Sequence, residues 1–356
     1  MSLRVGFLHL GRAESGVRRY GRILAQAAGM RDDLEVIEAD GGDRSSTLAD
    51  IRRAARKLRE ADVVHLQWKL ADWGGPYAAL PRLEVFLDAS RRTTVATLHD
   101  VYEPLGWRGR WTEPAALGIR RLSLSAASLV VHAEEERRRS SSLVAARKMR
   151  VVPHFVEQRH LPPHEQARSE LGLEGRRIIS LLGFMTRRKG HLLVLESLRL
   201  LPDDVVAIFA GAPIEGREQR ADELRAAARD LGVADRVRFT GYVPEDELER
   251  ILAATDVAAC PFRDLSASGS VATWISSGRP IVASDLPAFR EYQAMEAGSM
   301  HLFAPLTAEA FAATLRPLLD QPAPDGDPAV MRLRALLATP RIVDRYADIY
   351  REVVER

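Results

Sequence analysis

Lysine and arginine gather at one point where an apolar, strand-like run gives way to a helix-like pattern. The segment 183–190 reads GFMTRRKG, and its Lys189 is followed by a glycine at the expected start of a helix. An ammonium group and the free backbone N–H groups of a helix N-terminus can both contact a phosphate. Arg188 adds a second positive charge at the same turn. The segment therefore indicates a phosphate site, and a basic loop with solvated side chains is the alternative.

Small polar residues mark a second turn of the same kind. Ser268, Gly269 and Ser270 follow an apolar run and precede a helix-like stretch that contains Thr273. Small residues allow the backbone to approach an anion closely, hydroxyl groups add donors, and the helix dipole favours negative charge. An ordinary serine N-cap is the alternative. Because both turns lie in the second half of the chain, we expect them to face one diphosphate.

In the first half of the chain, polar residues follow two strand-like runs. Gly16 follows the first run, but Gly11 and Gly16 lack the G-x-G-x-x-G spacing, which argues against a nicotinamide or flavin enzyme. His99 and Asp100 stand at the carboxyl end of a later run. A histidine there can bind a substrate hydroxyl or transfer a proton, and a purely structural histidine is the alternative.

The tryptophans are unevenly distributed. Four of the five fall between residues 68 and 111: Trp68, Trp73, Trp107 and Trp111. We expect them in loops on the strand-end side of the first domain, where exposed rings such as those of Trp68 and Trp73 would stack on a sugar or an apolar acceptor. Loop anchoring by buried indoles is the alternative.

The elements that must position these residues predict an α/β fold. Short runs rich in Val, Ile and Leu without alternation are typical of parallel strands buried on both faces, and helix-like stretches separate them. We expect strands at 4–10, 34–39, 61–68, 93–100, 128–133 and 149–155, and then at 177–184, 205–211, 236–243, 256–262, 280–284 and 300–303, the last at a sheet edge.

A polar segment with two prolines, 156–168, indicates a linker between two doubly wound, Rossmann-like domains. We place the first domain at 1–157 and the second at 158–339. An amphipathic helix at 340–356 should pack back toward the first domain. Two such domains would face each other across a cleft lined by the carboxyl ends of both sheets, where open α/β sheets bind ligands.

Composition excludes several classes of function. The 356 residues include 51 Lys and Arg and 49 Asp and Glu, and a net charge of +2 gives no general basis for nucleic-acid binding. The single cysteine, Cys260, excludes an internal disulfide and argues against a cysteine-based metal site. No apolar run is long enough for a transmembrane helix, and the N-terminus reads as a strand rather than a signal peptide. We therefore expect a cytoplasmic protein.

The order of these segments resembles that of the GT-B glycosyltransferases of retaining family 4, over nearly the whole chain. GFMTRRKG is similar to the family's G-R-x-x-x-x-K-G segment, and VVPHFV to its V-I-P-x-G-V linker strand. VRFTGYVPEDELERILAATDVAACPF resembles its F-x-G-x-V-x-x-x-x-L-x-x-x-Y-x-x-A-D stretch, and SGRPIVASDLPAFRE its C-G-x-P-V-V-A-S-x-x-x-x-x-x-E segment. ADVVHLQW and ATLHD match strands of the family's acceptor domain.

The resemblance implies a UDP- or GDP-sugar donor bound mainly by the second domain, and a saccharide, lipid-linked or small-molecule hydroxyl acceptor bound by the first. Lys189 would contact the donor diphosphate, and Gly16 would approach it from the first domain. His99 would lie near the reacting sugar, and backbone near Val243 would line the base pocket. The resemblance also implies retention at the anomeric carbon, with no metal and no further cofactor.

Two departures from the family keep other functions open. The family's phosphate-binding Arg is Phe184 here, and its E-x7-E pair corresponds to Leu265 and Thr273, so both acids are missing. A non-catalytic nucleotide-sugar-binding or accessory protein is therefore an alternative, as is a GT-B epimerase or phosphorylase. The basic segment 52–59 leaves peripheral contact with the inner membrane face open, although its few large apolar residues favour a solvated helix face.

Overall fold

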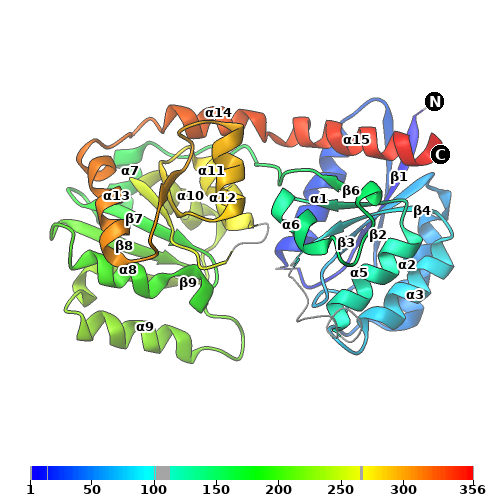
Figure 1. The fold of residues 1–356 in the computed structure, drawn as a ribbon, viewed down its shortest axis with the longest axis horizontal. Helices are drawn as coiled ribbons and strands as arrows, with labels where there is room; N and C mark the ends of the chain where they lie inside the picture. The colour runs from blue at the N-terminus through cyan, green and yellow to red at the C-terminus, as the bar shows by residue number, and fades with distance from the viewer. Residues whose placement is uncertain (1, 14, 100, 102–112, 265–267, 356) are drawn as a thin grey trace. The chain divides into compact units, whose positions relative to one another are not determined.

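The computed structural model describes the whole chain except residues 1, 14, 100, 102–112, 265–267 and 356. The chain divides into two compact units, shown in Figure 1. Unit 1 combines residues 1–155 with 339–356, and unit 2 comprises residues 156–338. Unit 1 is therefore made of two stretches of chain that are separated in sequence by all of unit 2.

Unit 1 is built on a parallel sheet whose strands lie in the order β2-β1-β3-β4-β5-β6. The chain leaves β1 toward β2 on one side and returns to β3 on the other, so the topological switch point lies between β1 and β3. The strands are β1 (Leu3–His9), β2 (Leu34–Asp40), β3 (Val63–Trp68), β4 (Thr93–Leu98), β5 (Ser128–Val131) and β6 (Met149–Val151). The helices are α1 (Gly16–Ala28), α2 (Leu48–Lys57), α3 (Ala79–Ser90), α5 (Pro114–Ser125), α6 (Glu134–Ser140) and α15 (Thr339–Glu355).

The last helix, α15, belongs to unit 1 because its apolar face packs there. It contacts α1, β3 and β4, and Ile342, Tyr346 and Tyr350 are fully buried. Spacings of three and four residues between buried positions are those of a single helix face, as the amphipathic pattern predicts. The predicted helix over 340–356 is confirmed, with its start one residue earlier.

Unit 2 has a second parallel sheet with the order β12-β11-β10-β7-β8-β9, and its switch point lies between β7 and β10. The predicted edge position of the last strand is confirmed. The strands are β7 (Arg177–Leu182), β8 (Val205–Ala210), β9 (Val237–Gly241), β10 (Val257–Cys260), β11 (Ile281–Ser284) and β12 (His301–Phe303). The helices are α7 (His164–Glu170), α8 (His191–Leu198), α9 (Gln219–Asp230), α10 (Glu245–Ala254), α11 (Gly269–Ser277), α12 (Pro287–Met295), α13 (Ala308–Asp320) and α14 (Pro328–Leu336).

The expected linker at 156–168 is only partly a linker. Helix α7 begins at His164, directly after Pro163, and continues to Glu170. Its Arg168 binds both carboxylate oxygens of buried Asp256 at 2.5 Å, so an ion pair fixes this helix against the base of β10. The prolines and polar residues of this segment favoured a linker, because the pattern carries no sign of the long-range contact with Asp256.

The inner strands of both sheets are buried on both faces, as parallel strands covered by helices require, whereas the edge strands β2 and β9 are partly exposed. In β3 every residue is buried, and in β8 every residue is buried. Within the described residues, no helix is long and apolar enough to cross a membrane.

Candidate functional site

Lys189 lies at the switch point of unit 2. It ends the 3-10 turn Arg187–Lys189 between β7 and α8. Its Nζ donates a hydrogen bond to Ser270 Oγ at 2.5 Å, at the start of α11 after β10. The two turns predicted to hold phosphate are thus joined directly, at the carboxyl ends of two neighbouring strands. This is the position at which doubly wound sheets bind ligands.

Two glycines allow this contact. Gly190 has a φ of 77°, and a Cβ there would lie 2.1 Å from the carbonyl oxygen of Pro261. Gly183 has a φ of 116°, and its Cα faces the end of the Lys189 side chain. A side chain at position 190 would force the two turns apart, so glycine is required there by both backbone conformation and space.

The ammonium of Lys189 has neutral neighbours. It lies 3.9 Å from the centre of the Phe262 ring, a cation–π contact. Within the described residues no ion pair joins it to a carboxylate. Burial lowers its pKa from 10.5 to about 8. An unneutralised, partly desolvated cation is a strong attractor for an anion.

The predicted serine turn surrounds the start of α11. Ser268 is the N-cap residue, yet its side chain makes no capping hydrogen bond and instead lies 2.9 Å from Ser270 Oγ. Gly269 is exposed. The free N–H groups of the first turn, with two hydroxyls beside them, form a set of donors next to Lys189.

The other residues predicted in unit 2 contribute less. Arg188 is exposed, and its guanidinium lies 3.6 Å from the carboxylate of Asp264. It therefore has an acidic partner, whereas Lys189 has none among the residues that the structure describes. The hydroxyl of Thr273 donates to the carbonyl of Gly269 within α11 at 2.9 Å. Val243 follows β9, and its side chain packs against a small core cluster that includes Ile208 and Ile251, which leaves backbone groups as its means of contacting a ligand.

In unit 1, His99 directly follows β4 and is 9% exposed. Its backbone N–H donates to the Trp68 carbonyl at 2.8 Å, and its Nε2 lies 2.8 Å from Gln67 Oε1. Burial, together with neighbouring His132 and His154, holds the pKa of His99 well below its usual value, so the ring is neutral near pH 7. A neutral imidazole can accept a hydrogen from a hydroxyl group.

Gly16 is the first residue of α1, and a Cβ there would meet nothing within 4 Å. The described residues therefore leave room beside Gly16, as close approach of a ligand requires. The N-cap residue Ser15 donates to Asp72 at 2.7 Å, which ties the turn after β1 to the turn after β3. Asp100, predicted beside His99, lies outside the described residues.

The predicted exposure of Trp68 and Trp73 is wrong. Trp68 is the last residue of β3 and is 1% exposed, and Trp73 is fully buried. The indole N–H of Trp73 donates to the Gln67 carbonyl at 2.8 Å. Gly118 makes room for the Trp68 ring, since a Cβ there would lie 1.9 Å from it. Both rings are therefore anchors that hold the ends of β3 and β4, and neither is available to stack on a sugar. Trp107 and Trp111 lie outside the described residues.

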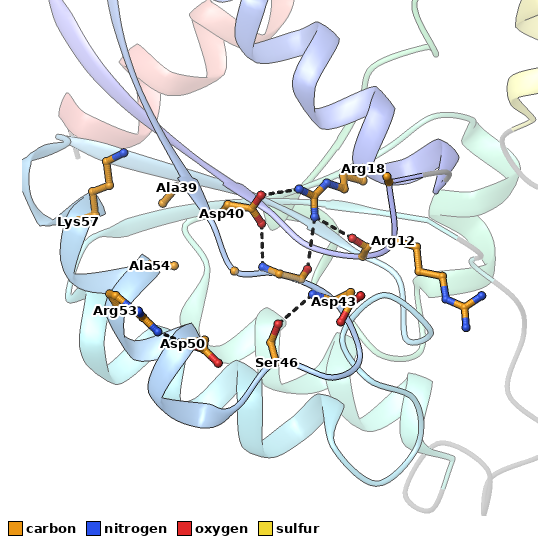
Figure 2. A pocket seen from close by; sticks show the side chains of 14 residues that line it. Arg12, Arg18, Ala39, Asp40, Asp43, Ser46, Asp50, Arg53, Ala54 and Lys57 are labelled. Carbon is orange, nitrogen blue, oxygen red and sulfur yellow. Dashed lines mark hydrogen bonds and ion pairs between the residues drawn. The ribbon is translucent and has the colours of Figure 1, made fainter. Parts of the chain in front are cut away.

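A hollow in unit 1 was not predicted from the sequence. It has a volume of about 710 Å³ and lies between the turns after β1 and β2 and the helix α2 (Figure 2). Arg18 spans one wall, donating to the Gly11 carbonyl at 2.8 Å and to Asp40 at 2.5 Å. Asp43 and Lys57 are further lining residues. The lining mixes acidic and basic groups, which suits a ligand rich in hydroxyl groups.

No group of three or more His, Cys, Asp or Glu that could hold a metal ion occurs among the residues the structure describes.

Comparison with known proteins gives these turns a context. Residues 176–321 match the family described as Glycosyl transferases group 1. The matched segment contains both turns of the Lys189 site.

Relatives and solved structures agree with that assignment. The chain is 28% identical to 2-deoxystreptamine glucosyltransferase of Streptomyces kanamyceticus over 63% of its length and 59% of the relative. It is 29% identical to D-inositol 3-phosphate glycosyltransferase of Nocardia farcinica over 66% of its length. The chain spans only about half of that second relative, 54% of its length. The structure of Anabaena HepE in complex with UDP and glucose matches with a TM-score of 0.78, at 15% identity, over 98% of this chain and 100% of the other. Sucrose-phosphate synthase of Thermosynechococcus elongatus matches with a TM-score of 0.72, at 17% identity, over 99% of both chains. The two doubly wound sheets are thus those of the GT-B glycosyltransferase fold.

Proposed function

We propose that this chain is a glycosyltransferase that moves a sugar from a nucleoside-diphosphate sugar to a hydroxyl group of an acceptor. The observation that carries the proposal is the Lys189 ammonium, which is held at the β7/β10 switch point by Ser270 and Phe262 and forms no ion pair with a carboxylate of the described residues. Such a cation beside the N-terminus of α11 suits the two negatively charged groups of a diphosphate.

The reaction breaks the bond between the anomeric carbon and the diphosphate oxygen. Positive charge develops on the sugar and negative charge on the leaving diphosphate, so stabilising the leaving group lowers the barrier most. Lys189 supplies the ammonium, and the first turn of α11 supplies N–H donors. The acceptor oxygen forms the new bond, and its proton passes to the departing diphosphate. We propose same-face attack with retention, as in family 4, and no metal in the transfer.

The donor is proposed to be a UDP-sugar before a GDP-sugar. The support is that HepE, which has the same fold, was solved with UDP and with UDP-glucose. The base would lie against backbone near Val243, after β9. His99 would accept a hydrogen from a hydroxyl of the reacting sugar.

The acceptor is proposed to be a hydroxyl-rich ring. Two relatives act, by their names, on 2-deoxystreptamine and on D-inositol 3-phosphate, which are both cyclitols. The charged lining of the unit 1 hollow, with Asp40, Asp43 and Lys57, offers hydrogen-bonding groups of both kinds to such a ring.

The test is nucleotide binding followed by transfer. Thermal unfolding of the wild type and of Lys189→Met is measured with UDP, GDP, UDP-glucose and GDP-mannose. A ligand at 100 times its Kd adds about 2.7 kcal/mol to the stability of the folded state. We expect a shift with a uridine nucleotide in the wild type and none in the variant, while Arg187→Met, which removes an exposed cation from the same turn, retains it. No shift with any nucleotide would refute the proposal.

Transfer is then assayed with cyclitol acceptors, with and without EDTA. Loss of Lys189 should lower kcat/KM by a factor corresponding to about 2–4 kcal/mol, as loss of one stabilising donor does in other enzymes. Product stereochemistry, read by NMR, tests retention. An undiminished rate in Lys189→Met would show that the ammonium has another role.

A second candidate function is nucleotide-sugar binding without catalysis. The observation that favours it is α11, whose first turn contains no acidic residue and whose Thr273 hydroxyl is bonded within the helix. The same thermal-shift panel with a positive result, combined with no transfer and no donor hydrolysis over a broad acceptor set, would support this candidate.

A further inference from the structure

The side chain of His99 has a partner that determines which ring nitrogen carries hydrogen. Its Nε2 lies 2.8 Å from Gln67 Oε1. An amide oxygen only accepts, so Nε2 must carry the hydrogen. The ring is neutral, so Nδ1 is then the unprotonated nitrogen, which can accept a hydrogen bond. The other neutral tautomer, with its hydrogen on Nδ1, would present an N–H donor where the ring now presents an acceptor.

Gln67 is itself fixed by its surroundings. The residue is only 8% exposed, and its backbone carbonyl accepts a hydrogen bond from the Trp73 indole N–H. Its Nε2 lies 3.4 Å from His65 Nε2, on the side away from His99. With the amide nitrogen turned toward His65, the oxygen is left for His99.

His65 is in turn fixed by the last helix of unit 1. Its Nδ1 lies 2.6 Å from the Tyr350 hydroxyl of α15, and its Nε2 lies 2.8 Å from Thr97 Oγ1. Thr97 Oγ1 is 3.2 Å from the Tyr346 hydroxyl, also of α15. A continuous buried set of hydrogen bonds therefore runs from α15 through β3 and β4 to His99. Buried networks of this kind are rigid when every member is satisfied.

The helix α1 leaves space for this amide. A Cβ at Gly21 would lie 3.2 Å from Gln67 Cγ. That distance is tighter than an ordinary contact, so a larger residue at position 21 would push the Gln67 side chain.

We propose that Gln67 is a positioning residue that holds His99 as its Nε2–H tautomer, with Nδ1 as a hydrogen-bond acceptor for a substrate hydroxyl. The tautomer follows from the geometry alone, and its use on a sugar hydroxyl rests on the proposed function. A donor sugar that offers a hydroxyl hydrogen to Nδ1 would be bound by this arrangement, and a group that offers only a lone pair would not.

The tautomer is read directly by 15N NMR of histidine-labelled protein, with the His99 signals identified by their loss in His99→Asn. Protonated and unprotonated ring nitrogens have well-separated shifts. In the wild type we expect His99 Nε2 protonated and Nδ1 unprotonated. Gln67→Leu should remove that preference, whereas Gln67→Glu, which keeps an acceptor oxygen, should retain it. Thr97→Val is the matched control, since it removes a buried hydrogen bond of the network without touching His99, and should keep the wild-type tautomer.

Transfer kinetics supply the second measurement. Gln67→Leu should lower kcat about tenfold, which is less than the roughly 10²–10⁴-fold contributed by a whole proton-transfer group, because His99 itself is retained. KM for the donor should change little, and Gln67→Glu should recover part of kcat. Because NMR reads the tautomer in an inactive protein as well, failure of the proposed function leaves this test intact. Hydrogen on Nδ1 in the wild type, or an unchanged tautomer in Gln67→Leu, would overturn the proposal.

Discussion

Replacing Lys189 with methionine should stabilise the ligand-free protein. In the folded state the pKa of this ammonium falls from 10.5 to about 8, chiefly because of burial. Each pKa unit corresponds to about 1.36 kcal/mol, so holding the charge in this site costs roughly 3 kcal/mol at pH 7. Loss of the hydrogen bond to Ser270 offsets about 1 kcal/mol of that gain. We therefore expect Lys189→Met to raise the free energy of unfolding by about 2 kcal/mol at pH 7.5.

The gain should depend on pH in a defined direction. The unfolded chain holds its proton on Lys189 up to about pH 10.5, while the folded chain releases it from about pH 8. Wild-type stability relative to the variant should therefore rise between pH 8 and 10.5, because the unfolded state binds more protons there. At pH 10 only about 1 kcal/mol of the penalty remains, so the two proteins should be almost equally stable.

Urea denaturation followed by circular dichroism, at pH 7.5 and pH 10, measures both quantities. Arg187→Met is the matched control, because it removes an exposed cation from the same turn and should change stability by less than about 0.5 kcal/mol. If Lys189→Met is less stable than the wild type at pH 7.5, or if its advantage is the same at both pH values, then the ammonium is not an unneutralised charge and the reasoning fails.

Three further predictions concern other parts of the two units. Gly118→Ala should destabilise unit 1 by about 1–3 kcal/mol, because its Cβ would lie 1.9 Å from the Trp68 ring; urea midpoints measure this, and an unchanged midpoint would contradict the packing. Gly190→Ala should abolish the nucleotide-induced thermal shift, because its Cβ would lie 2.1 Å from the Pro261 carbonyl oxygen. The tryptophan fluorescence of unit 1 should change little in this variant, and a retained thermal shift would contradict the prediction. Acid should destabilise unit 1 below about pH 6, because three histidines bind protons in the unfolded chain but stay neutral in the folded one. Each of them lowers the free energy of unfolding by up to about 1.4 kcal/mol per pH unit. A pH-independent unfolding midpoint between pH 6 and 4.5 would exclude this mechanism. Burial lowers the pKa of His65 to about 3, that of His132 to about 4 and that of His154 to about 3.

Much of the fold was predictable because buried parallel strands have a recognisable sequence pattern, a short and continuous apolar run. Runs such as 205–211 are apolar at every position, and only a strand covered on both faces needs that pattern. The turns around Lys189 and Ser270 were predictable for a similar reason, since glycine, lysine and serine at strand ends have few structural uses in that combination. Their direct contact was not predictable, because it depends on β7 and β10 lying side by side, 75 or more residues apart in sequence.

The features that could not be predicted from the sequence depend on contacts between residues that are distant in the chain. Trp68 ends a strand and Trp73 follows it closely, so the sequence favoured exposed rings in loops. The burial of Trp68 depends on Gly118, which lies on a helix distant in sequence. Gln67 carries no sequence signal at all as an amide within an apolar strand. Its role emerges only when β3 and β4 place it beside His99.

The interrupted make-up of unit 1 has a consequence for how the protein is made. A ribosome synthesises β1 to β6 first, then all of unit 2, and only afterwards the helix that carries Tyr346 and Tyr350. Until that helix emerges, the hydroxyl and imidazole groups of Thr97 and His65 lack the partners that they have in the finished core. Unit 2, whose residues are contiguous, can mature on the nascent chain while unit 1 waits. A gene rearranged so that translation starts with the final helix would remove that delay.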